Sequence, residues 1–193
     1  LVLETPILTT ADWMRLKAHF GKAVADIDCT FEAGSGADGL RKAISRIRQE
    51  AEQAVRAGMS ELFLTEESVS ESRVAIQMVL AAAAVHTHLV RCGLRSFASV
   101  NVRSAECLDT HYYAVLIGVG ATTVNAYLSE AAIVDRQARG LFGELTLDQC
   151  LARHRAAIGE GLLKIMSKMG IAVVSSYRGG YNFEAVGLSR ALV

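Results

Sequence analysis

The sequence predicts an α/β fold in which β/α units repeat around a parallel sheet. Short apolar runs suited to strands alternate with longer segments whose apolar residues recur at helical spacing. The unit repeats after roughly thirty residues, which is the length of a strand, a helix and their two loops. Strands that alternate with helices across short loops form a parallel sheet, either open or part of a barrel.

The first part of the chain is expected to hold one helix and one strand. Residues 1–8 are interpreted as an extended connector, and Thr9 or Thr10 can cap a helix that ends near Phe20. In residues 24–31 apolar and polar side chains alternate, as they do in a strand with one polar face.

Two helices with a strand between them follow. Residues 38–58 carry apolar side chains at helical spacing and charged ones opposite, which predicts an outer helix that Gly58 ends. Residues 61–65, ELFLT, are expected to form the next strand. Residues 74–92 are apolar nearly all the way round, which predicts a helix packed on several sides.

The same alternation continues through the middle of the chain. We expect a strand at residues 96–102, a helix at 105–118, a strand at 122–125 and a helix at 129–139. Thr146 and Asp148 can then cap a long helix that runs through Met169.

A candidate ligand site follows that long helix. Residues 171–174, IAVV, have the apolar character of a strand buried on both faces, and residues 175–180, SSYRGG, follow it. Ligands of parallel α/β folds bind beyond the carboxyl ends of strands, where glycines let backbone amides approach a phosphate or a flat ring. The alternative is that the glycines only end a helix and form a turn.

Polar side chains also follow other predicted strands. We expect one rim to be lined, together with Ser175 and Arg178, by Asn101, Arg103, Asn125 and Tyr127. This rim is interpreted either as a ligand site or as ordinary polar capping of strand ends. Glu66 and Glu67 are interpreted as solvated loop carboxylates, so no catalytic residue is assigned.

The histidines of the third helix raise the question of a metal. His86 and His88 are two residues apart on a helix and cannot share one ion, whereas His88 and Cys92, four apart, could. Because no third and fourth ligand stand at suitable spacing, no metal site is assigned and both histidines are interpreted as packing residues.

Composition excludes several classes of partner. Twenty basic residues balance twenty acidic ones, without a basic stripe, so neither a nucleic acid nor a membrane is an expected partner. Four cysteines without a CxxC pair are typical of reduced thiols in a cytoplasmic protein. The chain begins without methionine and stops early in an expected helix, so it is interpreted as an excised piece.

Two long segments carry a resemblance to a known family. They are residues 84–128, AVHTHLVRCGLRSFASVNVRSAECLDTHYYAVLIGVGATTVNAYL, and residues 161–193, GLLKIMSKMGIAVVSSYRGGYNFEAVGLSRALV. Both resemble the large (alpha) subunit of bacterial NADPH-dependent glutamate synthase, and weaker similarity extends to the amino-terminal end.

The resemblance implies an interior fragment of such a subunit. Residues 1–145 would be the C-terminal part of its central domain, and residues 146–193 the start of its FMN-binding β/α barrel. The parent enzyme transfers the amide nitrogen of glutamine to 2-oxoglutarate and forms two glutamates, using FMN and a 3Fe–4S cluster. Its implied partners are the remaining domains and an NADPH-oxidising small subunit.

The resemblance also implies which residues face the flavin and the substrate. Those expected to bind FMN are Met166, Ser167, Gly170, Ser175, Ser176, Tyr177, Arg178, Gly179 and Gly180. Lys164 and Lys168 are expected to bind 2-oxoglutarate. A flavin phosphate needs amides and hydroxyls, and a dicarboxylate needs cations, which this segment supplies.

Three functions from different classes stay open, the third being a zinc hydrolase, which a metal assay with stoichiometric zinc would support. The first is an enzyme fragment that links the glutaminase and FMN domains, inactive and without tightly bound FMN when isolated, because one strand cannot complete the cavity. The second is a stand-alone α/β module that binds a small phosphorylated or acidic ligand without catalysis.

Overall fold

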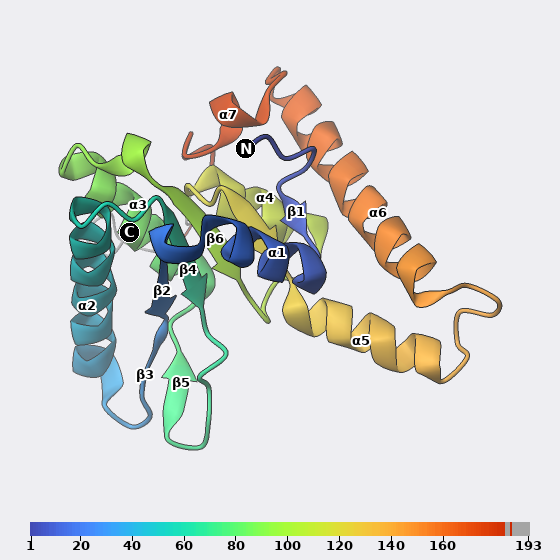
Figure 1. The fold of residues 1–193 in the computed structure, drawn as a ribbon, viewed down its shortest axis with the longest axis horizontal. Coiled ribbons are helices and arrows are strands. Elements are labelled where there is room, and N and C mark those ends of the chain that lie inside the picture. The colour runs from blue at the N-terminus through green and yellow to red at the C-terminus, as the bar shows by residue number, and fades with distance from the viewer. Residues whose placement is uncertain (184–185, 187–193) are drawn as a thin grey trace.

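A five-stranded parallel sheet forms the centre of the molecule (Figure 1). The computed structural model describes residues 1–183 and 186. Every neighbouring pair in the sheet is parallel, as predicted. In spatial order the strands are β1 (Ile7–Leu8), β7 (Thr123–Asn125), β6 (Ser99–Arg103), β4 (Glu61–Thr65) and β2 (Val24–Asp28).

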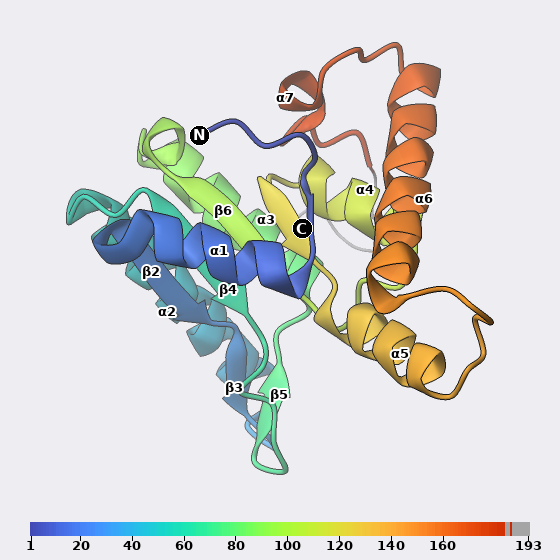
Figure 2. The same ribbon diagram turned by 45° about the vertical axis from the view of Figure 1, so that its right-hand side comes forward.

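Helices cover both faces of this sheet (Figure 2). One face carries α2 (Gly36–Arg56), α3 (Met78–Arg91) and α4 (Thr110–Gly118), which lead from each strand to its spatial neighbour. Their buried apolar side chains and those of the strands form the larger core. The opposite face carries α1 (Thr10–Phe20), whose Trp13 and Leu16 pack with Phe63 of β4 in a smaller core.

Three helices extend the fold beyond β7. They are α5 (Tyr127–Ala138), α6 (Leu147–Lys168) and the short α7 (Val174–Tyr177), and two 3₁₀ turns, η1 (Gly21–Ala23) and η2 (Arg95–Phe97), complete the helical elements among the described residues. Capping boxes at Thr9 and Thr146 start α1 and α6, which confirms both predicted helix starts. On α6 the buried face consists of Cys150, Ile158, Leu162 and Met166.

The strand expected at residues 24–31 is two strands. The Asp28 side chain accepts hydrogen bonds from the backbone nitrogen and the hydroxyl of Thr30, and this local bonding interrupts the strand. After it, β3 (Thr30–Glu32) leaves the sheet and pairs antiparallel with β5 (Arg73–Ala75). The predicted helix start at residue 74 was therefore wrong, because Val74 pairs with Phe31 in this hairpin.

Two further boundaries differ from the prediction. Residues 95–97 form η2, so the strand expected from residue 96 begins at Ser99. The helix expected from residue 105 begins at Thr110, because the Asp109 side chain accepts a hydrogen bond from the backbone nitrogen of Tyr112 and caps the helix there.

The strand expected at residues 171–174 does not form, and that prediction was wrong. A strand buried on both faces needs partners, and β7 already pairs on one side with β6 and on the other with β1, which belongs to the segment expected to be a connector. Val173 and Val174 are instead exposed, and α7 begins at Val174. The final residues of the predicted second domain, 184–185 and 187–193, lie outside the described residues.

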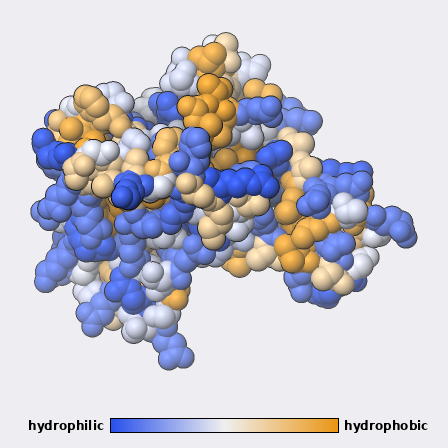
Figure 3. Space-filling model, viewed as in Figure 1, coloured by the Kyte–Doolittle hydropathy of each residue, from blue (hydrophilic) through white to orange (hydrophobic). Residues whose placement is uncertain are grey.

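The surface is mixed in character. Figure 3 shows hydrophobic side chains gathered where the amino-terminal segment lies in Figure 1, and Leu1 and Val2 are among the exposed apolar residues. Within the part of the chain that the structure describes, no helix combines the length and apolar character needed to cross a bilayer.

Candidate functional site

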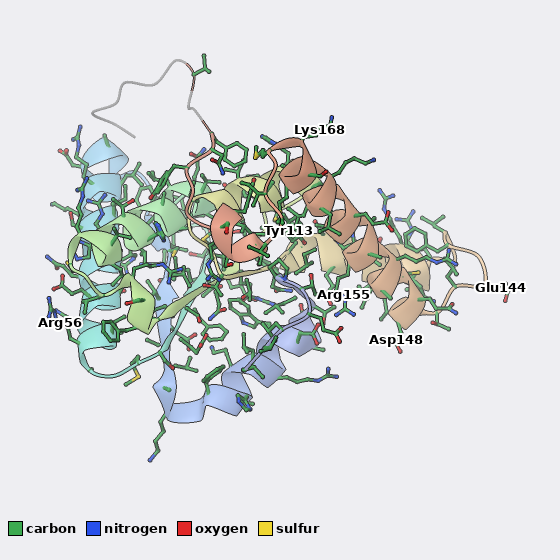
Figure 4. All side chains as sticks on the ribbon, turned by 90° about the horizontal axis from the view of Figure 1, so that it is seen from above. Arg56, Tyr113, Glu144, Asp148, Arg155 and Lys168 are labelled. Carbon is green, nitrogen blue, oxygen red and sulfur yellow. The ribbon has the colours of Figure 1, made fainter. Side chains whose placement is uncertain are left out.

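The segment with the predicted FMN and 2-oxoglutarate residues lies at the end of α6 and continues through α7 to residue 180. Its polar groups are mostly exposed: Lys164, Ser167, Lys168, Ser175 and Ser176. Figure 4 shows Lys168 at the far end of α6 from Asp148. Met166 and Tyr177 are instead buried in the core. The structure thus brings these predicted ligand residues onto one segment but not into one cavity.

Hydrogen bonds to backbone carbonyl oxygens of α4 dock this segment on that helix. Tyr177 donates from its hydroxyl to the carbonyl oxygen of Ala114 at 3.0 Å, and the Gly179 nitrogen donates to the carbonyl oxygen of Ile117 at 3.1 Å. The nitrogen of Gly180 donates to the carbonyl oxygen of Tyr177. The two glycine amides expected to approach a phosphate are therefore already engaged within the protein. Gly170, with a φ of 70°, turns the chain just after α6.

The segment lies at the amino ends of the strands, not at their carboxyl ends. Arg178 and Val174 line a cleft of about 250 Å³ together with Glu61 and Ser99, which are the first residues of β4 and β6. Near these amino ends, the side chain of Asn101 donates a hydrogen bond to the Glu61 carboxylate at 2.7 Å and accepts one from the Thr123 hydroxyl at 2.7 Å. The prediction that Ser175 and Arg178 share a rim with the residues after β6 and β7 was wrong, because their segment is not a strand of this sheet.

The remaining rim residues do meet at the carboxyl ends of the strands. Arg103 donates to the side-chain oxygen of Asn125, its guanidinium lies 4.9 Å from the ring centre of Tyr127, and its Nε lies 2.7 Å from a carboxylate oxygen of Glu67. These contacts favour polar capping over a ligand site, but they leave two buried atoms of the rim unsatisfied: Arg103 Nε makes an ion-pair contact without a hydrogen bond, and Oε2 of Glu66 has no hydrogen-bond partner among the described residues. Asn101 lies nearer the amino ends of the strands, as its hydrogen bond to Glu61, the first residue of β4, shows.

Glu66, expected to be solvated, is almost fully buried. Its carboxylate accepts hydrogen bonds from the Ala105 nitrogen and, at 3.4 Å, from the Ser104 hydroxyl. Burial raises the pKa of the Glu66 carboxyl, while the Ala105 bond opposes the rise. These contacts, both made by Oε1, hold the loop between β6 and α4, whereas Oε2 of Glu66 is buried without a hydrogen-bond partner in the part of the chain that the structure describes.

His86 lies behind the docked segment and is the most perturbed histidine of the region. It is 8% exposed, and its Nδ1 accepts a hydrogen bond from Nε of Arg95 at 2.9 Å. Arg95 also donates to the carbonyl oxygen of Gly120 at 2.8 Å. Burial, reinforced by the positive charges of Arg95 and Arg178, lowers the pKa of His86 to about 4. Sequence alone gives no signal for this cluster, because its members come from separate elements.

This histidine is expected to make the protein less stable in mild acid. The folded state resists protonating His86, whose ordinary pKa is 6.5, so the unfolded chain binds the extra proton and stability falls from pH 6.5 towards pH 4. Between pH 7 and pH 4.5 the loss from this group is about 2 kcal/mol. Urea unfolding of the wild type and of His86→Gln, which keeps a hydrogen-bond acceptor, measures it.

The comparison of the two proteins isolates the histidine from all other titrating groups. The free energy of unfolding of His86→Gln should change less between these two pH values than that of the wild type. Equal pH dependence in the two proteins would show that His86 is protonated as readily in the folded chain as in the unfolded one.

Comparisons with known proteins show which sequences this chain is similar to. A sequence model of the glutamate synthase central domain matches residues 1–189. The glutamate synthase [NADPH] large chain of Azospirillum brasilense is 58% identical over 193 residues, covering 100% of this chain and 13% of that protein. The corresponding large chain of Bacillus subtilis (strain 168) is 35% identical over 193 residues, with 99% and 12% covered.

A plant relative extends the similarity to another electron donor. The chloroplastic ferredoxin-dependent glutamate synthase of Spinacia oleracea is 37% identical over 205 residues, covering 100% of this chain and 13% of that protein. The chain therefore spans roughly one eighth of the length of these relatives, which matches the sequence resemblance described above.

Proposed function

Because this chain belongs to the glutamate synthase family, through its match to the central domain, we propose that it works as part of a glutamate synthase large chain. In that setting the larger polypeptide transfers the amide nitrogen of glutamine to 2-oxoglutarate, with electrons that pass from NADPH through a 3Fe–4S cluster to FMN. The observation that carries this proposal is similarity along the whole of the chain to large chains of that name.

The proposed role of residues 1–145 is architectural. As the later part of the central domain they hold the glutaminase domain and the FMN domain in register, which the passage of ammonia between two active sites requires. The fold suits this role, because hydrophobic cores on both faces of one sheet make the segment rigid, so it can fix the separation of two neighbouring domains. The remaining domains, an NADPH-oxidising small subunit and a cytoplasmic location belong to the same proposal.

Residues 146–193 are proposed to open the FMN-binding domain. One side of α6 is buried against the core, while Lys164 and Lys168 stay exposed on the other side. Exposed cations and the hydroxyls of Ser175 and Ser176 are free to face a flavin and a dicarboxylate supplied with the rest of the enzyme. Because Gly179 and Gly180 donate within this structure, we expect their amides to be released only if the segment rearranges in the larger polypeptide.

Neutralising the two lysines tests this assignment in the complete enzyme. In a large chain that contains this sequence, Lys164→Met and Lys168→Met are each expected to raise the KM for 2-oxoglutarate about tenfold, because a hydrogen bond between charged groups is worth roughly 1.5–3 kcal/mol. Steady-state kinetics at saturating glutamine measure the effect. FMN content, read from flavin absorbance, confirms that the variants are loaded.

Lys42→Met is the matched control, since Lys42 is an exposed lysine on the outer helix α2. An unchanged KM in both α6 variants would refute a substrate-binding role. Micromolar binding of FMN by the 193-residue chain alone would instead favour the stand-alone binding module.

A further inference from the structure

Three potential metal ligands meet where α2 packs against α3. Glu52 lies in the last part of α2, and His88 and Cys92 stand four residues apart at the end of α3, where they share one side of the helix. The Nε2 atom of His88 lies 2.7 Å from Oε2 of Glu52. The Cys92 sulfur lies 3.6 Å from the same oxygen and 3.8 Å from His88 Nε2. One nitrogen, one oxygen and one sulfur therefore lie within 4.8 Å of one another.

We propose that Glu52, His88 and Cys92 bind a divalent zinc ion, with a fourth coordination position left to solvent. These three ligand types are the ones that zinc takes in proteins, and three protein ligands with one open position form a common zinc site. The combination of a thiolate and an imidazole favours zinc over magnesium or calcium, which prefer oxygen ligands.

The separations of the ligand atoms fit tetrahedral zinc. Bonds of about 2.3 Å to sulfur and about 2.0–2.1 Å to nitrogen and oxygen place sulfur about 3.5 Å from each other ligand, and nitrogen about 3.3 Å from oxygen. Both observed sulfur distances are close to this value. Only the imidazole and the carboxylate, now hydrogen-bonded at 2.7 Å, must separate further, by about 0.6 Å.

The helix end, solvent access and the second oxygen of Glu52 favour a cation at this point, whereas the positive charge of Arg56 opposes it. Arg56 lies 2.8 Å from Oε1 of Glu52, which leaves the other carboxylate oxygen facing His88 and Cys92. Cys92 is the C-cap of α3, where the partial negative charge of the helix end stabilises cations. The side chains of Glu52 and His88 are about one-quarter exposed, so an ion and a water can reach the site.

Charge is balanced when zinc enters. Cys92 releases its proton to the solvent and coordinates as the thiolate, so the thiolate and the Glu52 carboxylate together neutralise the two positive charges of the ion.

The proposed zinc site lies far from the segment proposed to face the flavin. Figure 4 shows Arg56 at the end of α2, on the far side of the molecule from Lys168. This inference is therefore independent of the proposed flavin site. Without a metal, the same three residues would form an ion-pair network that joins the two helices.

Metal titration of the untagged 193-residue chain distinguishes a zinc site from an ion-pair network. After treatment with a chelator, we expect calorimetry with zinc chloride to give one zinc per chain with a Kd of about 1 μM or below. Cobalt(II) should give the near-ultraviolet charge-transfer band of a thiolate ligand. Cys92→Ala should abolish this band, and Cys92→Ala and His88→Gln should each weaken zinc binding at least about tenfold.

Matched variants keep the test specific. Cys150→Ala removes a cysteine from α6 and His19→Ala a histidine from α1, and neither change should alter the stoichiometry or the Kd. Glu52→Gln, which preserves the shape of the side chain, should weaken zinc binding in a chain whose circular dichroism is unchanged. Zinc binding below one equivalent, or equal affinity in wild type and Cys92→Ala, would overturn the proposal.

Discussion

Replacing Trp13 with alanine is expected to lower the free energy of unfolding by about 4 kcal/mol. Trp13 is 3% exposed, and its ring meets that of Phe63 edge to face with centres 4.6 Å apart. It is the largest side chain of the small core between α1 and the sheet, so its removal leaves a cavity that the two flanking elements cannot close. The Arg103 guanidinium, 6.0 Å from the Trp13 ring centre, also loses a favourable contact.

Met14→Ala is the control from the neighbouring position. Met14 belongs to the same helix but is 59% exposed, so its truncation should change stability by less than about 0.5 kcal/mol. Urea unfolding should be followed by far-ultraviolet circular dichroism, because Trp13 is the sole tryptophan and its loss removes the fluorescence signal. Similar losses in both variants would mean that α1 is not docked on this face of the sheet.

The elements predicted well from sequence are those with local signals. The strand Glu61–Thr65 has its predicted bounds, because the short apolar run at residues 62–64 stands between a helix that ends near Gly58 and the polar residues after Thr65. The starts of α1 and α6 were also predicted, since a capping box is formed by residues only three apart. A parallel sheet followed from the alternation of strands and helices alone.

The elements that sequence missed depend on distant partners. In β1 only Ile7 and Leu8 pair, and their partners Val124 and Asn125 lie far along the chain. Two residues carry no periodicity, so such a strand cannot be recognised from its own sequence. The residues 171–174 fail in the opposite way, because an apolar run looks like a buried strand although the neighbouring edge of β7 is already occupied by β1.

Predictions of the candidate sites divide along the same line. The meeting of Arg103, Asn125 and Tyr127 was predictable, because the carboxyl ends of neighbouring parallel strands must lie side by side. The contact of Glu52 with His88 and Cys92 was not predictable, since Glu52 lies on a different helix. Its position beside them depends on how α2 and α3 pack. Helical spacing reveals two ligands on one helix but never the third on another.

Gly120→Ala is expected to destabilise the protein by about 4 kcal/mol, through strain and overpacking together. Gly120 has a φ of 119°, a conformation that side chains other than glycine rarely adopt. A Cβ atom there would lie 2.2 Å from Nδ1 of His86 and 2.7 Å from its Cβ. The imidazole cannot simply swing away, because it is buried and Arg95 donates to its Nδ1.

A double-mutant cycle separates the two causes of this loss. Gly140→Ala, at a φ of 70° with open space around it, carries only the milder strain of the left-handed helical region and should cost about 1 kcal/mol. Combining Gly120→Ala with His86→Ala removes the ring contact but leaves the Cβ contact, so the pair should recover about 1–2 kcal/mol relative to additivity. If Gly120→Ala costs no more than Gly140→Ala, or if the cycle shows no coupling, then His86 does not pack against this turn, and the docking of residues 177–181 beside it loses its rigid support.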